Sequence, residues 1–398
     1  MKHLLIIGAG GVSRVATFKA AMAMKNNDGF NKITLASRTK SKCDEIANFI
    51  FERLGVSINT ASINADDSAQ VASLIEKIGA DLLLNLALPY QDLSLMDACE
   101  KTKISYIDTA NYEHPDTAKF EYKEQWAKNE AFKNAGILGL LGSGFDPGVT
   151  NVFCAYAKQN LFDEIYEIDI LDCNAGDHGY AFATNFNPEI NLREVSAKGR
   201  YYKDGKWIET EPLSEHFSWD YPKIGPKESY LMYHEELESL VKNIPSLRQI
   251  RFFMTFGESY LRHMRCLENV GMLRIDEVEH NGVKIVPIQF LKTLLPDPAS
   301  LGARTNGKTN IGCVISGVYK NKARKVYIYN VCDHEECFKE TNAQAVSYTT
   351  GVPAMIGAKL VAKGVWSALG VKNMEEFDAK PFMDELNQNG LPWEIIEL

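Results

Sequence analysis

The chain has 398 residues, of which 45% are hydrophobic and 24% charged, and its formal net charge is −9. This composition is that of a globular protein, and the length favours two domains. The negative charge argues against nucleic acid as a partner, and no apolar run is long enough to span a membrane. Met1 leads directly into a strand, so we expect no signal peptide, and eight scattered cysteines then indicate reduced thiols in the cytoplasm.

The first predicted unit is a short apolar strand over residues 2–7, a glycine-rich turn and a helix over residues 15–25. A dinucleotide site needs this order, because bare backbone must approach the pyrophosphate and the helix N-terminus supplies N–H donors. Ser13 stands where such turns often close with a third glycine, whose role is close packing, and a small serine is compatible with that role. The alternative is an ordinary glycine-rich turn. The cofactor-binding residues expected in this turn are Gly8, Gly10, Gly11, Val12 and Ser13.

The second predicted strand covers residues 32–36 and ends in Ser37, Arg38 and Thr39. A chain that binds NAD usually carries an acidic residue at this point, which accepts hydrogen bonds from the adenosine ribose. Two hydroxyls and a guanidinium suit a 2′-phosphate instead, so the sequence predicts NADPH. The alternative is that Arg38 is a solvated loop residue.

Alternation of strand and helix continues to about residue 148 and predicts a Rossmann-type, doubly wound parallel α/β sheet. The ligand of such a sheet lies outside the carboxyl ends of its strands. These ends add Asp66, Ala87, Leu88, Pro89 and Asn111 to the expected cofactor contacts. The further elements are helices over 40–54, 68–78 and 91–101, and strands over 57–63, 80–86, 104–108 and 137–141.

Asp146 and Pro147 follow the last of these strands and precede a helix predicted over residues 149–159. One interpretation is that Asp146 caps this helix, with Pro147 at its first position. The other is that Asp146 lies at the substrate. The sequence leaves both open.

The pattern then changes to strands near 164–172, 199–209 and 249–255 and a hairpin over 314–318 and 325–331. This mixed pattern predicts a second α+β domain, which makes a homodimer plausible. An apolar helix over residues 353–366 is expected to return to the first domain. We therefore expect a dinucleotide-binding domain of residues 1–148 plus about 343–398, and a substrate and dimerisation domain of residues 149–342.

Residues 177–188 combine histidine, tyrosine, phenylalanine and asparagine in a run that suits a pocket wall, with Asn185 near its centre. Arg193 could clamp a carboxylate in bidentate fashion or lie on the surface, and Lys308 lies in a second basic loop. Cys332 and Cys337 lack a distant partner pair of the zinc type, so we expect no metal.

The motifs GAGGVS, SRT, LALPY, DTANYE and GFDPGVTN, in this order, resemble the saccharopine dehydrogenase-like reductases. The later blocks DHGYAFATNFNPEINLREV, GKTNIG, YNVCDHEE and SYTTGVPA resemble the polyamine branch of that family, the carboxynorspermidine (carboxyspermidine) dehydrogenases. The resemblance spans almost the entire chain.

The resemblance implies an NADPH-dependent reductive condensation of L-aspartate β-semialdehyde with 1,3-diaminopropane or putrescine through a Schiff base. It implies small-molecule partners and neither nucleic acid nor membrane. The alternatives are a saccharopine-type dehydrogenase for another amino-acid semialdehyde, and a non-catalytic NADPH-binding sensor.

The implied reaction also gives roles to several polar residues of this sequence. Arg193, Lys308 or the turn after Asp146 would hold the amino-acid carboxylate. The candidates for the general acid are His178, Tyr90 and Asp146. The candidates for the far ammonium of the diamine are Asp108, Tyr112, Asp177 and Glu189.

Overall fold

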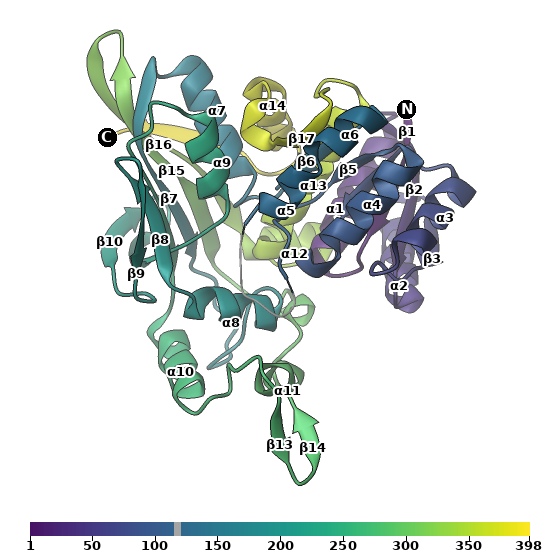
Figure 1. Cartoon of the computed structure of the whole chain (residues 1–398), viewed down its shortest axis with the longest axis horizontal. Helices are drawn as coiled ribbons and strands as arrows, with labels where there is room; N and C mark the ends of the chain where they lie inside the picture. The colour runs from purple at the N-terminus through teal and green to yellow at the C-terminus, as the bar shows by residue number, and fades with distance from the viewer. Residues whose placement is uncertain (115–120) are drawn as a thin grey trace.

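The computed structural model describes residues 1–114 and 121–398 and contains two large sheets, one in each half of the molecule (Figure 1). The first has seven strands in the order β17-β6-β5-β4-β1-β2-β3, and every neighbouring pair is parallel. The predicted doubly wound α/β sheet is therefore confirmed, with β17 as an addition that the sequence pattern does not indicate. The strands are β1 (Lys2–Ile7), β2 (Phe30–Ser37), β3 (Asn59–Ser62), β4 (Leu82–Asn85), β5 (Ser105–Ile107), β6 (Leu138–Leu141) and β17 (Gly370–Asn373).

Helices cover both faces of this sheet, because successive side chains of a buried strand point to opposite sides. Leu4 and Ile6 of β1 share a core with helices α1, α2 and α13, whereas Leu5 and Ile7 share another with α3, α4 and α6. These helices are α1 (Gly11–Lys25), α2 (Lys40–Leu54), α3 (Ser68–Ile78), α4 (Asp92–Thr102), α6 (Asn129–Ala135) and α13 (Ala345–Ala362), with the shorter η1 (Pro89–Gln91) and α5 (Lys123–Ala127).

The second sheet has nine strands, of which seven follow the order β10-β11-β12-β7-β15-β16-β18 and two, β8 and β9, extend from β12. Among the described strands of this sheet, only β7 and β12 are parallel neighbours, so the sheet is mixed, as predicted. The strands are β7 (Glu164–Asn174), β8 (Gly199–Lys203), β9 (Lys206–Thr210), β10 (His216–Tyr221), β11 (Gly225–Met232), β12 (Gln249–Thr255), β15 (Lys308–Tyr319), β16 (Lys322–Asp333) and β18 (Trp393–Glu397).

Further helices surround the second sheet, and a small hairpin of β13 and β14 projects from the lower end of the molecule (Figure 1). One face of the sheet shares the large core that also holds α1 and α13, so the two halves of the molecule are packed together. The remaining elements are α7 (Val149–Asn160), α8 (Pro188–Ser196), α9 (Glu236–Asn243), α10 (Glu258–Asn269), β13 (Val278–His280), β14 (Val283–Ile285), α11 (Pro287–Leu294), η2 (Pro298–Ser300), α12 (His334–Thr341), η3 (Met374–Glu376) and α14 (Ala379–Gln388).

The chain returns to the first domain through α13, as expected, although the helix begins at Ala345 and contains Pro353 in its interior. At Gly351 a Cβ atom would lie 2.7 Å from Cβ of Val15, so α13 and α1 are in close contact there. The last strand differs from the expectation. β18 pairs with β16 in the second sheet, so residues 393–397 do not join the first domain. The domain boundaries otherwise stay a prediction.

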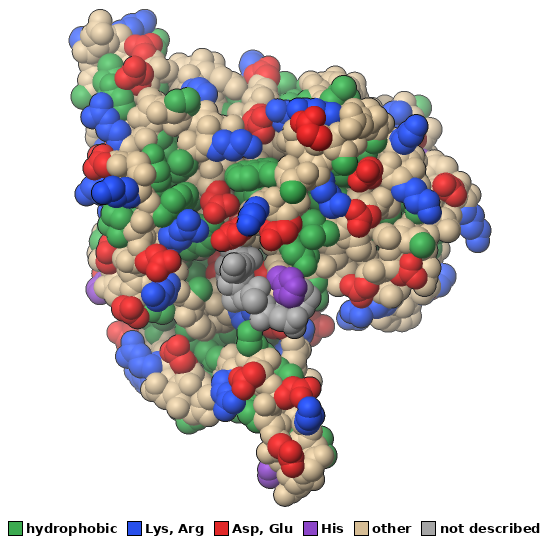
Figure 2. All heavy atoms as spheres, in the orientation of Figure 1, with side chains coloured by type: hydrophobic (Ala, Val, Ile, Leu, Met, Phe, Trp, Pro, Cys, Tyr) green, Lys and Arg blue, Asp and Glu red, His purple; other side chains and the backbone are tan. Residues whose placement is uncertain are grey.

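The surface carries charges of both signs. Figure 2 shows Lys and Arg side chains interspersed with Asp and Glu over the face in view, which bears no continuous patch of one sign. Among the described residues, no helix is long and apolar enough to cross a membrane.

Candidate active site

A cavity of about 1350 Å³ lies between the two domains, at the carboxyl edge of the parallel sheet. In open α/β sheets this edge is where ligands bind. The cavity is lined from the first domain by residues 9–14, 86–89 and 109–111, and from the second by Asp172, Asn174, Glu194, His234 and Glu235 and by much of the run 176–188. Residues 342–344, Thr349 and Thr350 close it from the side of α13.

The glycine turn after β1 has the geometry of a phosphate cradle. Gly8 has φ +115°, and a Cβ atom there would lie 2.3 Å from the carbonyl oxygen of Leu86, so only glycine fits. A Cβ atom at Gly10 would meet nothing within 4 Å, so the backbone at Gly10 borders open space. This is room that an approaching pyrophosphate needs.

Helix α1 begins at Gly11, and its first backbone hydrogen bond runs from the N–H of Arg14 to the carbonyl of Gly10 at 3.0 Å. The N–H groups of Gly11, Val12 and Ser13 therefore have no partner within the helix and are available to an anion. Ser13 is fully buried, in keeping with the packing role predicted for it. These residues fit the pyrophosphate of a dinucleotide.

The end of β2 presents Arg38 to solvent, and Ser37 Oγ donates to the carbonyl of Thr39 at 3.0 Å. Among the described residues, no carboxylate forms an ion pair with Arg38, so the guanidinium is available to an incoming phosphate. Asp66 accepts a hydrogen bond from Gln91 Nε2 at 2.8 Å. The described lining of the cavity does not include Ser37, Arg38, Thr39 or Asp66. The contacts of these residues with the cofactor stay predictions.

Two other strand ends predicted from sequence do line the cavity. Ala87, Leu88 and Pro89 follow β4, where the N–H of Ala87 donates to Asn85 Oδ1 at 3.0 Å. Asn111 follows β5, and its N–H donates to Glu235 Oε1 at 3.3 Å. The second domain thus contacts the cofactor-binding edge directly.

One side of the cavity is strongly acidic. Its lining combines Asp146 of the first domain with Asp172, Glu194 and Glu235 of the second, whereas Lys292 is the only Lys or Arg of the second domain among the described lining residues. A low-dielectric cavity with this excess of carboxylates favours a ligand with several positive charges.

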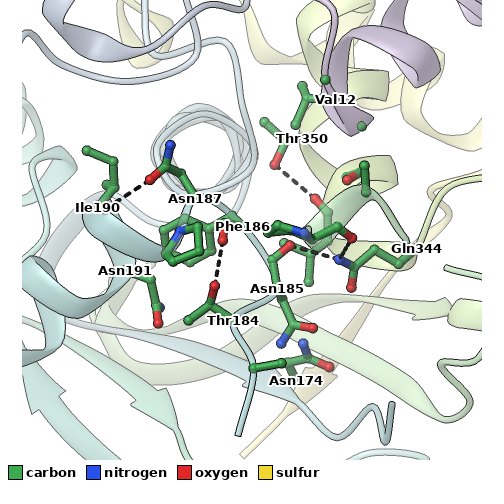
Figure 3. Close-up of a pocket in the computed structure, with 18 of the residues that line it drawn as sticks. Val12, Asn174, Thr184, Asn185, Phe186, Asn187, Ile190, Asn191, Gln344 and Thr350 are labelled. Carbon is green, nitrogen blue, oxygen red and sulfur yellow. Dashed lines mark hydrogen bonds between the residues drawn. The ribbon is translucent and has the colours of Figure 1, made fainter. Parts of the chain in front are cut away.

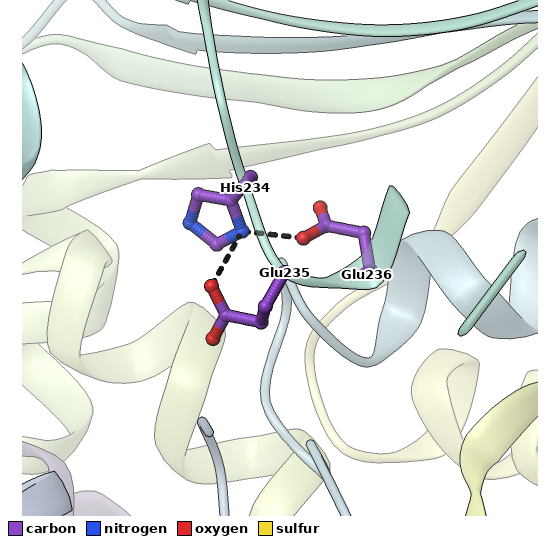
Figure 4. Close-up of side chains that lie close together, drawn as sticks. All are labelled: His234, Glu235 and Glu236. Atoms are coloured by element: carbon purple, nitrogen blue, oxygen red, sulfur yellow. Dashed lines mark hydrogen bonds and ion pairs between the residues drawn. The ribbon is translucent and has the colours of Figure 1, made fainter. Parts of the chain in front are cut away.

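His234 lies beside several of the acidic residues, and Figure 4 shows its ring next to the carboxylates of Glu235 and Glu236. Its Nδ1 lies 3.3 Å from Glu235 Oε2 and also contacts the carboxylate of Glu236, and its Nε2 lies 3.4 Å from Glu194 Oε1. Burial alone would lower the pKa of His234, but these three carboxylates raise it well above its ordinary value. The ring is therefore a cation that offsets only part of the surrounding negative charge.

The carboxyl groups of the cavity hold protons more tightly than free side chains. Burial raises the pKa of Glu194 to about 7 and that of Asp172 to about 6, although the charge of His234 opposes both shifts. Burial and the neighbouring Asp172 also raise the pKa of Asp146. Groups that titrate near neutral pH are suited to proton transfer.

Ligand atoms of His234, Glu235 and Glu236 lie within 4.8 Å of one another. The imidazole Nδ1 is already engaged by both carboxylates. The three groups therefore form an ion-pair cluster, in which Glu236 Oε1 has no hydrogen-bond partner among the described residues.

Neutral polar groups line the floor of the cavity (Figure 3). Gln344 Nε2 donates to the carbonyls of Asn185 and Pro298 at 2.8 and 3.1 Å. The side-chain oxygens Asn185 Oδ1 and Gln344 Oε1 and the hydroxyl of Thr309 are buried and form no hydrogen bond with a described residue. They are free to accept hydrogen bonds from an ammonium group.

Of the substrate and catalytic residues predicted from sequence, four line the cavity: Asp146, Asp177, His178 and Asn185. His178 Nδ1 accepts a hydrogen bond from the N–H of Tyr180 at 3.1 Å, and burial lowers the pKa of its ring. Asp146 does not cap α7. That helix begins at Val149 after Gly148, whose N–H donates to Asn151 Oδ1, so the capping interpretation is wrong and the Asp146 side chain is left to the cavity.

The other predicted residues are held outside the described lining. Arg193 lies 2.9 Å from Glu113 and 3.8 Å from Glu189, and it donates to Tyr90 Oη at 3.1 Å. Asp108 accepts from the N–H of Gly142 and from Gln125 Nε2, both at 2.7 Å. Lys308 lies 3.8 Å from Asp333, and the N–H of Tyr112 donates to Gln125 Oε1 at 3.0 Å.

Several cavity residues escape prediction from sequence, namely Glu113, Asp172, Asn174, Glu194, His234, Glu235, Lys292 and Gln344. The sequence does give a partial signal for Asp172, because it lies on the same face of β7 as the apolar residues Ile168 and Ile170. A charged side chain on the buried face of a strand is rare and indicates a functional or paired group. The three consecutive ionisable residues His234, Glu235 and Glu236 give a second indication of such a site.

Two family models match this chain: the saccharopine dehydrogenase NADP binding domain over residues 4–140, and the saccharopine dehydrogenase C-terminal domain over residues 144–391. The chain is 56% identical to carboxyaminopropylagmatine dehydrogenase of Synechocystis sp., with 99% of this chain and 97% of that protein aligned. It is 41% and 40% identical to the carboxynorspermidine synthases of Vibrio alginolyticus and Vibrio cholerae, again with 99% and 97% aligned.

In structure, the chain is similar to the apo L-Glu-forming saccharopine dehydrogenase of Saccharomyces cerevisiae. The TM-score is 0.73, the sequence identity is 14%, and the alignment covers all of both chains. This similarity shows a shared fold. The relatives and the match to an NADP-binding domain confirm the prediction of NADPH as cofactor.

Proposed function

The chain belongs to the saccharopine dehydrogenase family and is an NADP-dependent oxidoreductase, and from this premise we propose that it condenses an amino-acid semialdehyde with a polycationic amine and reduces the product. The aldehyde is L-aspartate β-semialdehyde, and the linkage forms through a Schiff base. The products are carboxyaminopropyl derivatives of the amine, as in polyamine biosynthesis. A homodimer and a cytoplasmic location belong to the same proposal.

The observation that carries the proposal is the acidic side of the cavity. Asp146, Asp172, Glu194 and Glu235 line it, and the charge of His234 offsets only part of theirs. An amine with two positive charges would pair with the carboxylates that His234 leaves unpaired, and this pairing is favourable because a buried, unpaired carboxylate costs free energy.

The amine that we favour is agmatine, which has an amine at one end and a guanidinium at the other. Support comes from the relative at 56% identity, whose name contains agmatine, whereas the carboxynorspermidine synthases are only 40% and 41% identical. A guanidinium forms paired hydrogen bonds with carboxylates, and the cavity offers several. 1,3-Diaminopropane and putrescine are the second candidates.

The semialdehyde brings an ammonium and a carboxylate of its own. Lys292, whose Nζ lies 3.2 Å from Glu189 Oε2, is the described lining lysine of the second domain and would pair with the substrate carboxylate. The free acceptors Asn185 Oδ1 and Gln344 Oε1 would receive the ammonium. Enclosure between the domains excludes water that would hydrolyse the imine.

The cofactor supplies hydride to the imine carbon. The residues that would hold it are the N–H groups of Gly11, Val12 and Ser13 for the pyrophosphate and Arg38, Ser37 and Thr39 for the 2′-phosphate. Asp66, Ala87, Leu88, Pro89 and Asn111 complete the proposed contacts.

The test is the initial rate of NADPH oxidation with L-aspartate β-semialdehyde and each amine in turn. We expect turnover with agmatine, at a higher kcat/KM than with putrescine or 1,3-diaminopropane. Pentylamine, which has one amine and no second cation, is the matched control and should have a much higher KM. Turnover only with glutamate and aminoadipate semialdehyde would contradict the proposal, as would NADPH binding without turnover of any pair.

A further inference from the structure

Two carboxyl groups, one from each sheet, meet inside the cavity. Asp146 lies in the segment after β6, at the carboxyl edge of the parallel sheet, and Asp172 lies in β7 of the second sheet. Their side chains are hydrogen-bonded to each other. Oδ2 of Asp146 is buried and has no hydrogen-bond partner among the described residues. Both residues line the cavity, so a substrate bound there lies beside this pair.

A hydrogen bond between two carboxyl groups requires a proton, because ionised carboxylates have no donor. Two like charges in contact also resist simultaneous ionisation. Asp146 and Asp172 therefore share one proton, so that one carboxyl group is protonated and the other is ionised. Such a pair can both accept and donate a proton without reorganising.

We propose that Asp146 and Asp172 form the proton-transfer centre of the condensation, a role that rests on the function proposed above. The ionised member takes a proton from the substrate ammonium, and the free amine attacks the aldehyde carbon. The carbinolamine that forms loses its hydroxyl as water when the pair donates a proton to it. The amine nitrogen contributes its electron pair to the new C=N bond, which leaves a protonated imine.

The proton count closes over these steps. One proton leaves the ammonium and one is delivered to the departing hydroxyl, so aldehyde and ammonium give protonated imine and water with no net change. Hydride then reduces the imine carbon, and the secondary amine takes up one proton from the solution. The pair ends in the state in which it began.

The surroundings maintain the half-ionised state. His234, Glu194 and Glu236 are the further charged groups whose fields act on Asp146, and His234 and Glu236 act on Asp172. The His234 cation favours one ionised carboxylate, while Glu194 and Glu236 oppose a second. Burial raises the pKa of Asp172 to about 6, close to a neutral working pH.

The two other general-acid candidates that the sequence predicts, Tyr90 and His178, are less suitably placed. Tyr90 does not line the described cavity, and its hydroxyl accepts a hydrogen bond from Arg193. His178 does line it, but its Nδ1 is engaged by the backbone N–H of Tyr180.

The experiment compares Asp172→Asn and Asp146→Asn with the matched control Asp169→Asn. Asp169 lies on the same strand as Asp172 but pairs with Arg251 at 2.7 Å, outside the cavity. The assay measures kcat and KM with L-aspartate β-semialdehyde and agmatine from pH 5 to pH 10, and NADPH affinity by fluorescence.

We expect kcat of both cavity variants to fall by about 10²- to 10⁴-fold, with NADPH affinity unchanged. The bell-shaped pH profile of kcat in the wild-type enzyme should lose a limb, because a single carboxyl group has one ionisation where the pair has two. Asp169→Asn should keep both the rate and the profile.

Three results would overturn the role of the pair: an unchanged kcat in Asp172→Asn, a reduced kcat with an unaltered pH profile, or an equal loss in Asp169→Asn. Failure of the proposed function is distinct from these, since it would appear as absence of turnover in the wild-type enzyme itself. The pair's role would then fall with it.

Discussion

Glu113 and Arg193 form a buried ion pair, with Oε1 of the first 2.9 Å from Nη2 of the second, and it joins the two domains. Glu113 follows β5 of the parallel sheet, whereas Arg193 lies in α8 beside the second sheet. Arg193 also donates to Tyr90 of the first domain. The residue that the sequence suggests as a clamp for substrate thus connects the domains on which the cavity depends.

The first prediction concerns this ion pair. Arg193→Ala should lower the free energy of unfolding by about 3–5 kcal/mol, because it leaves the Glu113 carboxylate buried without its partner. The double variant Glu113→Gln/Arg193→Ala should recover part of the loss, and chemical denaturation measures both. A rise in the KM for the semialdehyde without destabilisation would instead restore Arg193 to the role of substrate clamp.

The second prediction concerns the choice of cofactor. Arg38→Asp should weaken NADPH binding by roughly 10- to 100-fold, since a charge-assisted contact is worth about 1.5–3 kcal/mol, and should leave NADH binding unchanged or improved. Fluorescence titration of the free enzyme measures both. Lys32→Asp, at an exposed position near the other end of β2, is the control. Equal losses for the two cofactors would show that Arg38 does not contact the 2′-phosphate.

The third prediction separates folding from cofactor binding within the glycine turn. Gly10→Ala should keep the stability of the wild type but bind NADPH poorly, because its methyl group enters the open space of the cradle. Gly8→Ala should be destabilised, since its Cβ would lie 2.3 Å from the Leu86 carbonyl at a φ of +115°. Thermal unfolding and NADPH titration distinguish the two. Tight NADPH binding by Gly10→Ala would place the pyrophosphate elsewhere.

The fourth prediction concerns the energetic cost of the acidic cavity. The pKa of Glu194 is raised to about 7, mainly by burial, while the group titrates near 4.5 when unfolded. The folded state therefore binds the proton more tightly, and stability falls as the pH rises from about 4.5 through 7. His234, Glu235, Asp172 and Glu236 are the charged groups that act on it.

Glu194→Gln should accordingly raise the free energy of unfolding at pH 8 by on the order of 1–3 kcal/mol and change it little at pH 4.5. The KM for agmatine should rise in the same variant, because one carboxylate of the proposed amine site is lost. Denaturation at the two pH values and steady-state kinetics measure these effects. Glu209→Gln, at an exposed position in β9, is the control. Destabilisation at pH 8 would contradict the assigned cost.

Much of the first domain is readable in the sequence because its signals are local. The helices Lys40–Leu54 and Ser68–Ile78 have the bounds that their apolar spacing predicts, and the glycine turn follows β1 as expected. β17 and β18 are different, because each is a short segment near the C-terminus that becomes a strand only by pairing with a distant neighbour, β6 or β16. The strand propensity of a short segment does not indicate which distant strand it will pair with.

The sequence by itself determined the parallel sheet, the family and the cofactor, because a phosphate cradle is built from consecutive residues whose backbone conformation is local. It did not determine the acidic side of the cavity, where we propose that the amine binds. Asp146, Asp172, Glu194 and His234 lie far apart along the chain, and only packing of the two domains makes them neighbours. The same packing places Arg193 beside Glu113, so its buried guanidinium forms an ion pair there and is not among the described residues that line the cavity.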